Sequence, residues 1–346
     1  MIFLQTSAAQ LRHVAAHLLT PLLMCLGMGL AYLGAFHQPE PHHLPVAVVG
    51  AGPQEMVLAQ ALQDKAGGGL EVLTLPDRDA AVSQLRERDL AGAYLPDAHH
   101  PELLVAKGSS DTTAMAVELV FKQVAGQQGV PLTVTDIAPT APGDPTGQGI
   151  FFLLVALSVG SYGSVAAIGA AGAGLSMRMR ALIGVVTSLA VSLIGLAVAG
   201  PVFGVVDHDY AAIWGMSWLY SAGIVLVGIG LHTFLKRWTT LVLMVMFVML
   251  NFTSSGGIYR PELQNGFFGA LHSFWNGAGF VEGARSLLYF DGGAGFGGRI
   301  ASLALWLVAG VVLLVVAARY ERGQAPVAAE PAPRAAEEEM EEAVGV

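Results

Sequence analysis

The sequence predicts a membrane protein made of an all-α six-span bundle, with one extracytoplasmic α/β domain inserted after the first span. Two observations support this fold class. Hydrophobic residues make up 54% of the 346-residue chain and charged residues only 12%, whereas an ordinary soluble protein has about 25% charged residues. The shortage of charge is uneven, because residues 37–148 hold 14 Asp and Glu and 6 Lys and Arg. That content is normal for a water-soluble fold.

Six apolar stretches reach or approach the roughly 20 residues that a helix needs to cross a bilayer. The fifth is the weakest, because it is short and runs into an aromatic loop. The first could instead be a cleaved signal peptide, although its end at 32–36 is a poor cleavage site. The only cysteine, Cys25, lies in the first stretch and excludes an intrachain disulfide. The stretches are residues 14–36, 150–173, 181–206, 211–235, 238–256 and 300–318.

Basic residues flank alternate ends of these stretches, and basic loops stay in the cytosol. If the spans simply alternate, all of the following fall on one side: Arg12, Arg178, Arg180, Lys236, Arg237, Arg319 and Arg322. Both termini are therefore predicted to be cytosolic in a plasma (inner) membrane, with 1–13 as the cytosolic N-terminus and 37–148 outside. The net charge of −9 offers no basic surface for nucleic acid.

Strand-like and helix-like runs alternate within 37–148 in the order β-α-β-α-β-β-α-β. This order predicts a small α/β sandwich with a partly parallel sheet. Pro53 suits the start of the first helix, and Ser110 or Asp111 suits the N-cap of the third. Strands are expected at 45–50, 70–75, 91–95, 103–106 and 132–137, and helices at 53–66, 77–89 and 111–127.

Two patterns in this domain invite a functional interpretation. AVVGAGPQ at 47–54 lacks the third glycine of a dinucleotide fingerprint, so a tight strand-to-helix turn is favoured. The pairs His42–His43 and His99–His100 could bind a metal. Adjacent histidines point apart in an extended strand, however, and no cysteine or clustered carboxylate joins them, so surface histidines are favoured. No metal and no cofactor is expected.

A Pro- and Gly-rich connector, APTAPGDPTGQG at 138–149, joins the domain to the second stretch. It predicts a linker or hinge at Asp144, Pro145 and Gly147. Residues 150–256 then hold spans two to five, and Asn251 at the end of the fifth is expected to hydrogen-bond between helices.

The spans carry no Asp, Glu, Lys or Arg near the predicted bilayer midplane, which argues against a proton- or sodium-driven pump. Small residues recur instead in the second and fourth stretches, at spacings of three to four. They let helices approach closely, either within the bundle or across a dimer seam. They are Gly160, Gly163, Ala167, Ala171, Gly174, Gly223, Gly228 and Gly230.

Residues 257–297 form a long loop rich in glycine and aromatic residues. Two helical pieces are expected, Pro261–Phe274 and Gly279–Phe290, each too short and too polar to cross. They predict re-entrant or interfacial helices, which could cap a pathway on the outer side or form an ordinary aromatic belt. The residues expected in such a cap are Phe267, Phe268, Phe274, Trp275 and Phe280. The last span, 298–318, is followed by a disordered acidic cytosolic tail at 319–346.

This architecture resembles that of type-2 ABC exporter permeases, the transmembrane subunits of such exporters. It is most similar to the branch of actinobacterial membrane proteins that contains the phage infection protein. The resemblance covers nearly the whole chain and rests on degenerate motifs. They are Val46–Val49, Ala93-Tyr94-Leu95-Pro96, Asp144-Pro145-Thr146-Gly147 and GARSLLYFDGG at 283–293. One departure is that only Phe3–Leu11 precedes the first span where an amphipathic interfacial helix would be expected.

The resemblance implies a permease that forms a homodimer or heterodimer and couples to a separate ABC ATPase. It implies that the short cytosolic loop 174–180 docks the ATPase, with Met177 and Met179 as packing contacts and Arg178 and Arg180 as electrostatic ones. For the two arginines, a role in topology alone is an equal alternative. The chain has no G-x-x-x-x-G-K-[ST] motif for ATP hydrolysis.

Two functions follow as expectations. The first is an export permease that moves a hydrophobic or amphiphilic substrate outward, driven by the partner ATPase. The second is a non-transporting receptor or cell-envelope interaction protein that uses its outer domain. No catalytic residue set is recognised, so the chain is not expected to be an enzyme.

Overall fold

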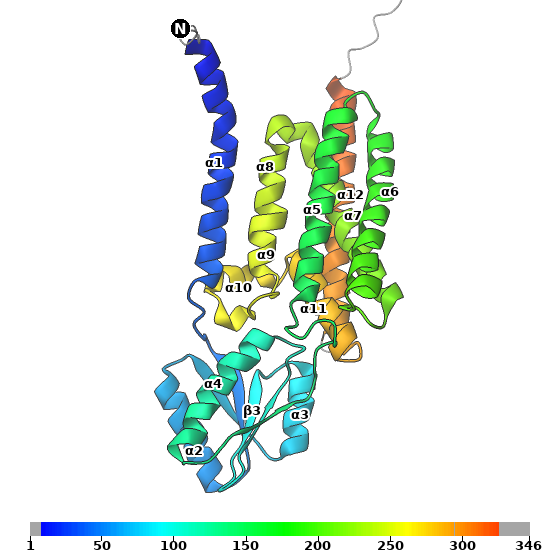
Figure 1. Cartoon of the computed structure of the whole chain (residues 1–346). Helices are drawn as coiled ribbons and strands as arrows, with labels where there is room; N and C mark the ends of the chain where they lie inside the picture. The colour runs from blue at the N-terminus through cyan, green and yellow to red at the C-terminus, as the bar shows by residue number, and fades with distance from the viewer. Residues whose placement is uncertain (1–7, 294, 325–346) are drawn as a thin grey trace, which may run out of the picture.

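The computed structural model describes residues 8–293 and 295–324 and separates a bundle of long helices from an α/β domain at one end (Figure 1). Five helical segments in these residues are long and apolar enough to cross a membrane. The chain is therefore a multi-pass membrane protein. The segments are Leu11–Phe36, Gly149–Ala171, Met177–Val202, Tyr210–Ser254 and Phe296–Gln324.

Helix α7 (Tyr210–Leu235) is the centre of the bundle, and every residue from Tyr220 to Gly230 is buried. It packs against α5 (Gly149–Ala171), α6 (Met177–Ala197) and α12 (Phe296–Gln324). Two of the predicted small residues explain how closely these helices approach. A side chain on Gly230 would meet the backbone of Leu313 and Leu314, and one on Gly228 would meet Val165. Gly163 faces open space.

The 45-residue segment Tyr210–Ser254 doubles back at a 3-10 turn, Lys236–Trp238, where Lys236 has a φ of 47°. Its second arm consists of α8 (Thr239–Met244), a π-helix (Val245–Leu250) and α9 (Asn251–Ser254). These pieces of 6, 6 and 4 residues extend only about 24 Å, less than the roughly 30 Å of a hydrocarbon core. This agrees with the short fifth stretch in the sequence.

Helix α1 (Ala8–Phe36) stands at the edge of the bundle (Figure 1). Most of its large apolar side chains are exposed, from Leu11 to Leu33. It contacts the rest of the protein in its second half, where Gly27 lies against Met249 and the Gly34 carbonyl accepts a hydrogen bond from Asn265 Nδ2 at 3.2 Å.

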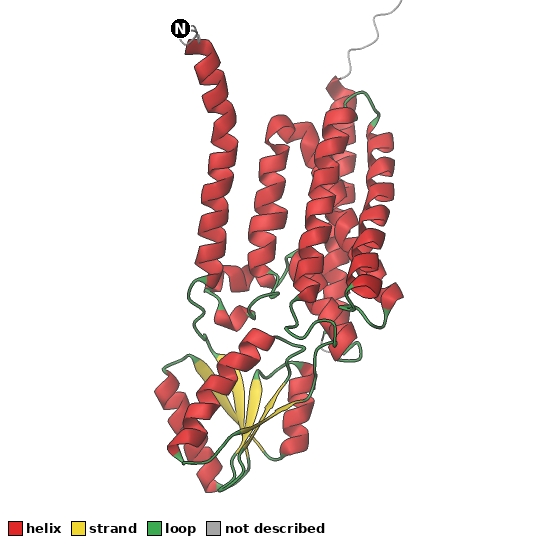
Figure 2. Cartoon of the chain, in the orientation of Figure 1, coloured by secondary structure: helices red, strands yellow, loops and turns green. Residues whose placement is uncertain are grey.

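The outer domain has the predicted element order β-α-β-α-β-β-α-β. Its five-stranded sheet has the order β2-β1-β3-β4-β5; β1 is parallel to β2 and β3, β4 is antiparallel to β3, and β5 is parallel to β4. Helices α2 and α4 cover one face of the sheet and α3 covers the other (Figure 2). The strands are Leu44–Val49, Leu70–Leu75, Gly92–Leu95, Glu102–Val105 and Thr133–Asp136, and the helices are Pro53–Ala66 (α2), Arg78–Glu87 (α3) and Asp111–Gln127 (α4).

Two predicted boundaries are wrong. Helix α12 continues through Arg319 to Gln324, although a disordered tail was expected from residue 319, because Glu321 of its last turn is held by Arg180 at 2.6 Å. The excursion 257–297 breaks at 273–275, whereas the two expected helical pieces, Pro261–Phe274 and Gly279–Phe290, left the break at 275–278. Its elements are a 3-10 turn (Pro261–Leu263), α10 (Gly266–His272) and α11 (Asn276–Tyr289). The predicted tail beyond residue 324 and residues 1–7 lie outside the described residues.

The connector to α5 is a capped and packed turn. Asp144 is buried, and its carboxylate accepts hydrogen bonds from the backbone N–H of Gln148 at 3.1 Å and of Gly149 at 2.8 Å. Gly147 has a φ of 64°, which favours glycine. A side chain on Gly143 would collide with the backbone of 203–204. Two of the three residues predicted to form a hinge, Asp144 and Gly147, thus hold this turn in place.

Candidate functional site

Helix α11 starts inside the bundle and runs toward the outer domain, and it is almost completely buried. Every residue from Asn276 to Ser286 is buried, and the helix packs against α7, α12 and α5. Glycines allow α11 to pack this closely against its neighbouring helices. A side chain on Gly283 would collide with Met216 of α7, and one on Gly279 would press on the Arg299 carbonyl of α12 at 3.2 Å. The sequence predicted a helix here but not its depth.

The N-terminal end of α11 meets a chain of uncharged polar groups inside the bundle. Tyr220 Oη lies 2.5 Å from Ser158 Oγ and accepts a hydrogen bond from Asn251 Nδ2 at 2.6 Å. Asn251 Oδ1 in turn accepts from the backbone N–H of Gly277 at 2.8 Å. Four helices are joined in this way, which confirms the prediction that Asn251 hydrogen-bonds between helices. The side chain of Asn276 is also fully buried, and neither of its polar atoms has a partner among the described residues.

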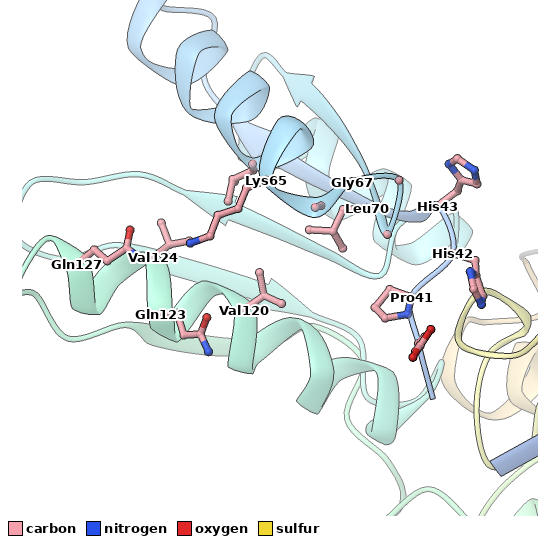
Figure 3. A pocket seen from close by; sticks show the side chains of 15 residues that line it. Pro41, His42, His43, Lys65, Gly67, Leu70, Val120, Gln123, Val124 and Gln127 are labelled. Atoms are coloured by element: carbon pink, nitrogen blue, oxygen red, sulfur yellow. The ribbon is translucent and has the colours of Figure 1, made fainter. Parts of the chain in front are cut away.

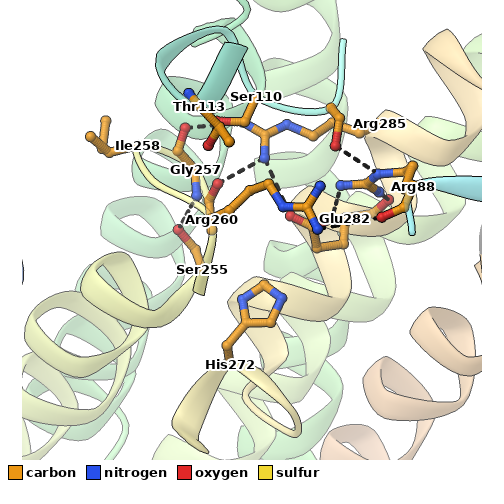
Figure 4. A network of polar contacts seen from close by, with 12 residues as sticks. Arg88, Ser110, Thr113, Ser255, Gly257, Ile258, Arg260, His272, Glu282 and Arg285 are labelled. Atoms are coloured by element: carbon orange, nitrogen blue, oxygen red, sulfur yellow. Dashed lines mark hydrogen bonds and ion pairs between the residues drawn. The ribbon is translucent and has the colours of Figure 1, made fainter. Parts of the chain in front are cut away.

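The middle of α11 carries a buried ion cluster that reaches the outer domain (Figure 4). Glu282 forms an ion pair with Arg285, one turn further on, at 3.2 Å, and another with Arg88 of the outer domain. All three side chains are at least nine-tenths buried. Arg285 also donates to the carbonyl oxygens of Gly256 at 2.7 Å and Gly257 at 3.0 Å. The Glu282–Arg285 pair therefore ties the outer domain, α11 and the segment that follows α9 together.

Arg88 reaches this cluster because it ends helix α3 in the left-handed conformation, with a φ of 66°. The residues around it form a second set of links between domain and bundle. Arg260 donates to the carbonyl oxygens of Arg88 at 3.3 Å and Leu90 at 3.4 Å, and it pairs with Glu262 at 2.8 Å. Thr112 Oγ1 donates to the Ile258 carbonyl at 2.5 Å. The domain is thus joined to the excursion through both side chains and backbone.

The electrostatics of the cluster favour charged Glu282 and neutral His272. Burial alone would raise the pKa of Glu282, but the guanidinium groups of Arg88 and Arg285 outweigh it and lower the pKa to about 2. Burial lowers the pKa of His272, and Arg299 adds to that effect, while Glu282 and Glu262 oppose it. The neutral ring is oriented by a contact of 2.9 Å between Nδ1 and the Ser254 carbonyl.

The lowered pKa of His272 predicts a stability that depends on pH. Because the unfolded chain binds a proton more readily than the folded one, we expect stability to be full above about pH 6.5 and to fall as pH drops below that value. Glu282 contributes a further loss only between about pH 4.5 and 2. His272→Asn keeps a donor near Ser254 and removes the titration. Thermal unfolding of the two purified proteins at pH 7.5 and 5.5 measures this; an equal drop in both would contradict the assignment.

The five aromatic residues predicted as an outer cap are divided among three places. Phe267 and Phe268 stack edge to face on α10, and Phe274 and Trp275 sit where α10 gives way to α11. The Trp275 ring packs against the Trp306 ring of α12. Phe280 is buried against Tyr220 in the bundle, with ring centroids 5.3 Å apart. The structure thus does not bring the five together in one lid.

The four residues predicted to dock an ATPase form the first turn of α6 and not a loop, and only some of them are exposed. Met177 and Arg180 are buried, the first in the bundle core and the second in its ion pair with Glu321. Arg178 and Met179 are exposed, and Met179 is 45% accessible. Arg178 and Met179 alone remain available to a partner.

The motif-like patterns of the outer domain have local explanations. Gly50 and Gly52 form the turn before Pro53 of α2, and the Glu55 side chain lies against both glycines, so a carboxylate occupies the position that a nucleotide phosphate would need. His99 and His100 follow Asp97, whose carboxylate accepts from both backbone N–H groups at 2.8 Å. Residues 8–293 and 295–324 contain no group of three or more His, Cys, Asp or Glu suited to a metal.

Comparison of the chain with protein-family models, with curated proteins and with solved structures gave no match.

The ion cluster was not predicted from the sequence, in which Glu282 and Arg285 fall within the loop expected at 257–297. One local signal was present: two opposite charges at i,i+3 lie in a run of Gly, Ala and Val that has no other charge, and such a pair in a buried helix neutralises itself. Nothing local pointed to Arg88, which is 194 residues away from Glu282.

Proposed function

We propose that the chain is the transmembrane subunit of an exporter, in which a separate ATPase supplies the energy. The observation that supports this most is α11, an almost completely buried helix that carries a charged cluster and is bonded to the outer domain. Buried charges are costly unless they are paired, and in membrane proteins they mark functional sites. A helix that turns back inside the protein is tolerated where it borders other protein or a cavity.

We propose that the chain crosses the membrane six times, with both termini in the cytosol. The hairpin within Tyr210–Ser254 supplies two antiparallel arms. Counting its short second arm as a crossing gives the six passes that we propose. Basic residues at the end of the bundle remote from the outer domain support this orientation. The outer domain then lies on the extracytoplasmic face. We expect the permease to work as a dimer, as in the family that the sequence resembles.

Coupling is proposed to run through α11. The Arg88–Glu282 pair makes the outer domain and α11 move together, and the Gly277–Asn251 hydrogen bond links α11 to the interior of the bundle. At the opposite end, Arg180 and Glu321 join the start of α6 to the end of α12. A partner that pushes on the exposed Arg178 and Met179 would therefore move both helices.

Arg178→Glu tests the proposed ATPase contact. We expect the variant to fold normally, because Arg178 is exposed, and to lose copurification with an ATPase of the native host, together with ATP hydrolysis in that fraction. Arg180→Glu is a poor test, because it would also break the buried pair with Glu321. Affinity purification from native membranes followed by an ATPase assay measures both effects.

Arg322→Glu is the matched control, because Arg322 is exposed at the same end of the bundle but lies on α12. It should leave the ATPase bound. Consistent absence of an ATPase from the wild-type preparation would reject the exporter. Equal ATPase recovery with wild type and Arg178→Glu would reject Arg178 as the contact.

A groove in the outer domain favours a second candidate function, that of a non-transporting receptor. The groove has a volume of about 700 Å³, in the range typical of small-molecule sites. A receptor would bind its ligand there without an ATPase, so the same purification separates the two functions.

A further inference from the structure

The groove lies between α2 and α4 on one face of the sheet (Figure 3). Its floor is apolar. Leu70 of β2 and Val120 of α4 face each other across it, and Leu62, Ala66 and Val124 complete the lining. These residues belong to the main core of the domain or pack directly against it. A ligand would therefore bury apolar surface on a preformed wall.

The polar groups of the groove are unevenly placed. The side chain of Lys65 stretches from α2 across the groove toward Val124 of α4, and Gln127 lies beyond it (Figure 3). Lys65 has no ion-pair partner in the part of the chain that the structure describes. Pro41 lies at the other end, and Glu40, which precedes it in the chain, also lines the groove. The groove thus has a cationic end and an anionic end joined by a largely apolar floor, to which Gln123 adds one amide group.

The anionic end of the groove adjoins the membrane part of the protein. His42 lines the groove and also lines a second cavity of about 590 Å³ beside α10. The His42 backbone N–H donates to the Glu262 carbonyl at 2.7 Å, which fixes this end to the excursion. Phe267 of α10 is exposed. Asn265, just before α10, donates a hydrogen bond to the Gly34 carbonyl at the end of α1. His42 therefore lies between the groove and the second cavity.

We infer that the groove binds the acyl chain of a single-chain anionic amphiphile, with the chain on the apolar floor and the negative head group at Lys65. The apolar side chains of the floor favour a hydrocarbon chain. The unpaired ammonium group at one end selects an anionic head, and Glu40 at the other end disfavours the reverse orientation. The binding itself does not depend on the proposed export; that the amphiphile is the exported substrate does rest on it.

Photolabelling of the full chain in phosphatidylcholine nanodiscs tests this inference. The probes are a photoreactive palmitic acid and the corresponding photoreactive alcohol, and peptide mass spectrometry locates the label. We expect the acid to label peptides that contain 62–70 or 120–124. Lys65→Glu should reduce that labelling by about fivefold, the equivalent of about 1 kcal/mol, and Val124→Glu should reduce it by a similar amount.

Leu119→Glu is the matched control, because Leu119 is on the same helix and 62% exposed but does not line the groove. It should label as wild type does. Labelling confined to the membrane helices, or equal labelling of wild type, Lys65→Glu and Val124→Glu, would overturn the site. Equal labelling by the acid and the alcohol would overturn the anionic head group. Since no ATPase and no ATP are present, these outcomes do not depend on whether the chain is an exporter.

Discussion

Arg88→Ala should lower the free energy of unfolding by about 3 kcal/mol or more, the effect expected when one partner of a buried ion pair is removed. The variant leaves the Glu282 carboxylate, 5% exposed, with Arg285 as its remaining close cation. It also removes the donors that reach Ser109 Oγ and the Glu282 carbonyl. Thermal unfolding of the purified protein, followed by tryptophan fluorescence, measures the loss.

Arg86→Ala provides the comparison on the same helix. Arg86 approaches Asp291 at 3.6 Å, but both side chains are largely exposed, at 53% and 94%. Such an exposed pair contributes little to stability, so Arg86→Ala should unfold at nearly the same temperature as wild type. If Arg86→Ala and Arg88→Ala unfolded at the same temperature, the ion cluster would not be what joins the domain to α11.

Gly277→Ala should destabilise the protein by about 1–3 kcal/mol, the usual range for overpacking a core. The new methyl group would collide with the Asn251 side chain, and moving Asn251 away would break its hydrogen bonds to Tyr220 and to the Gly277 N–H. We also expect α11 to pack less tightly in the bundle. Limited proteolysis would then cleave the variant faster than wild type at 290–298.

Gly215→Ala tests the same substitution with the opposite expectation. Gly215 lies within α7 and has open space around its Cα. Alanine is a better helix former than glycine by about 1 kcal/mol, so this variant should be unchanged or slightly more stable. A loss of stability equal to that of Gly277→Ala would show that the collision with Asn251 is not the cause.

Local patterns in the sequence were sufficient to predict the outer domain. Pro53 begins α2 and three glycines follow Ala66, so both ends of that helix were marked, and the two predicted bounds match the structure. Apolar runs of strand length separated the helices and defined the element order. The parts that could not be predicted depend on distant contacts. The sequence placed Arg180 in a loop, whereas in the structure it forms an ion pair with Glu321. The sequence also placed the Gly-rich helix α11 at the surface, whereas in the structure α7 and α12 cover it.

The separation between Arg88 and Glu282 also has a consequence for how the protein is made. Translation at about 5–20 residues per second would produce Glu282 roughly 10–40 s after Arg88, because 194 residues separate them. All five strands are complete by Asp136, so the outer domain has time to fold while its attachment site is still unsynthesised. During that interval Arg88 is a solvated surface residue. Arg88 is therefore buried late in assembly, only after α11 has entered the bundle.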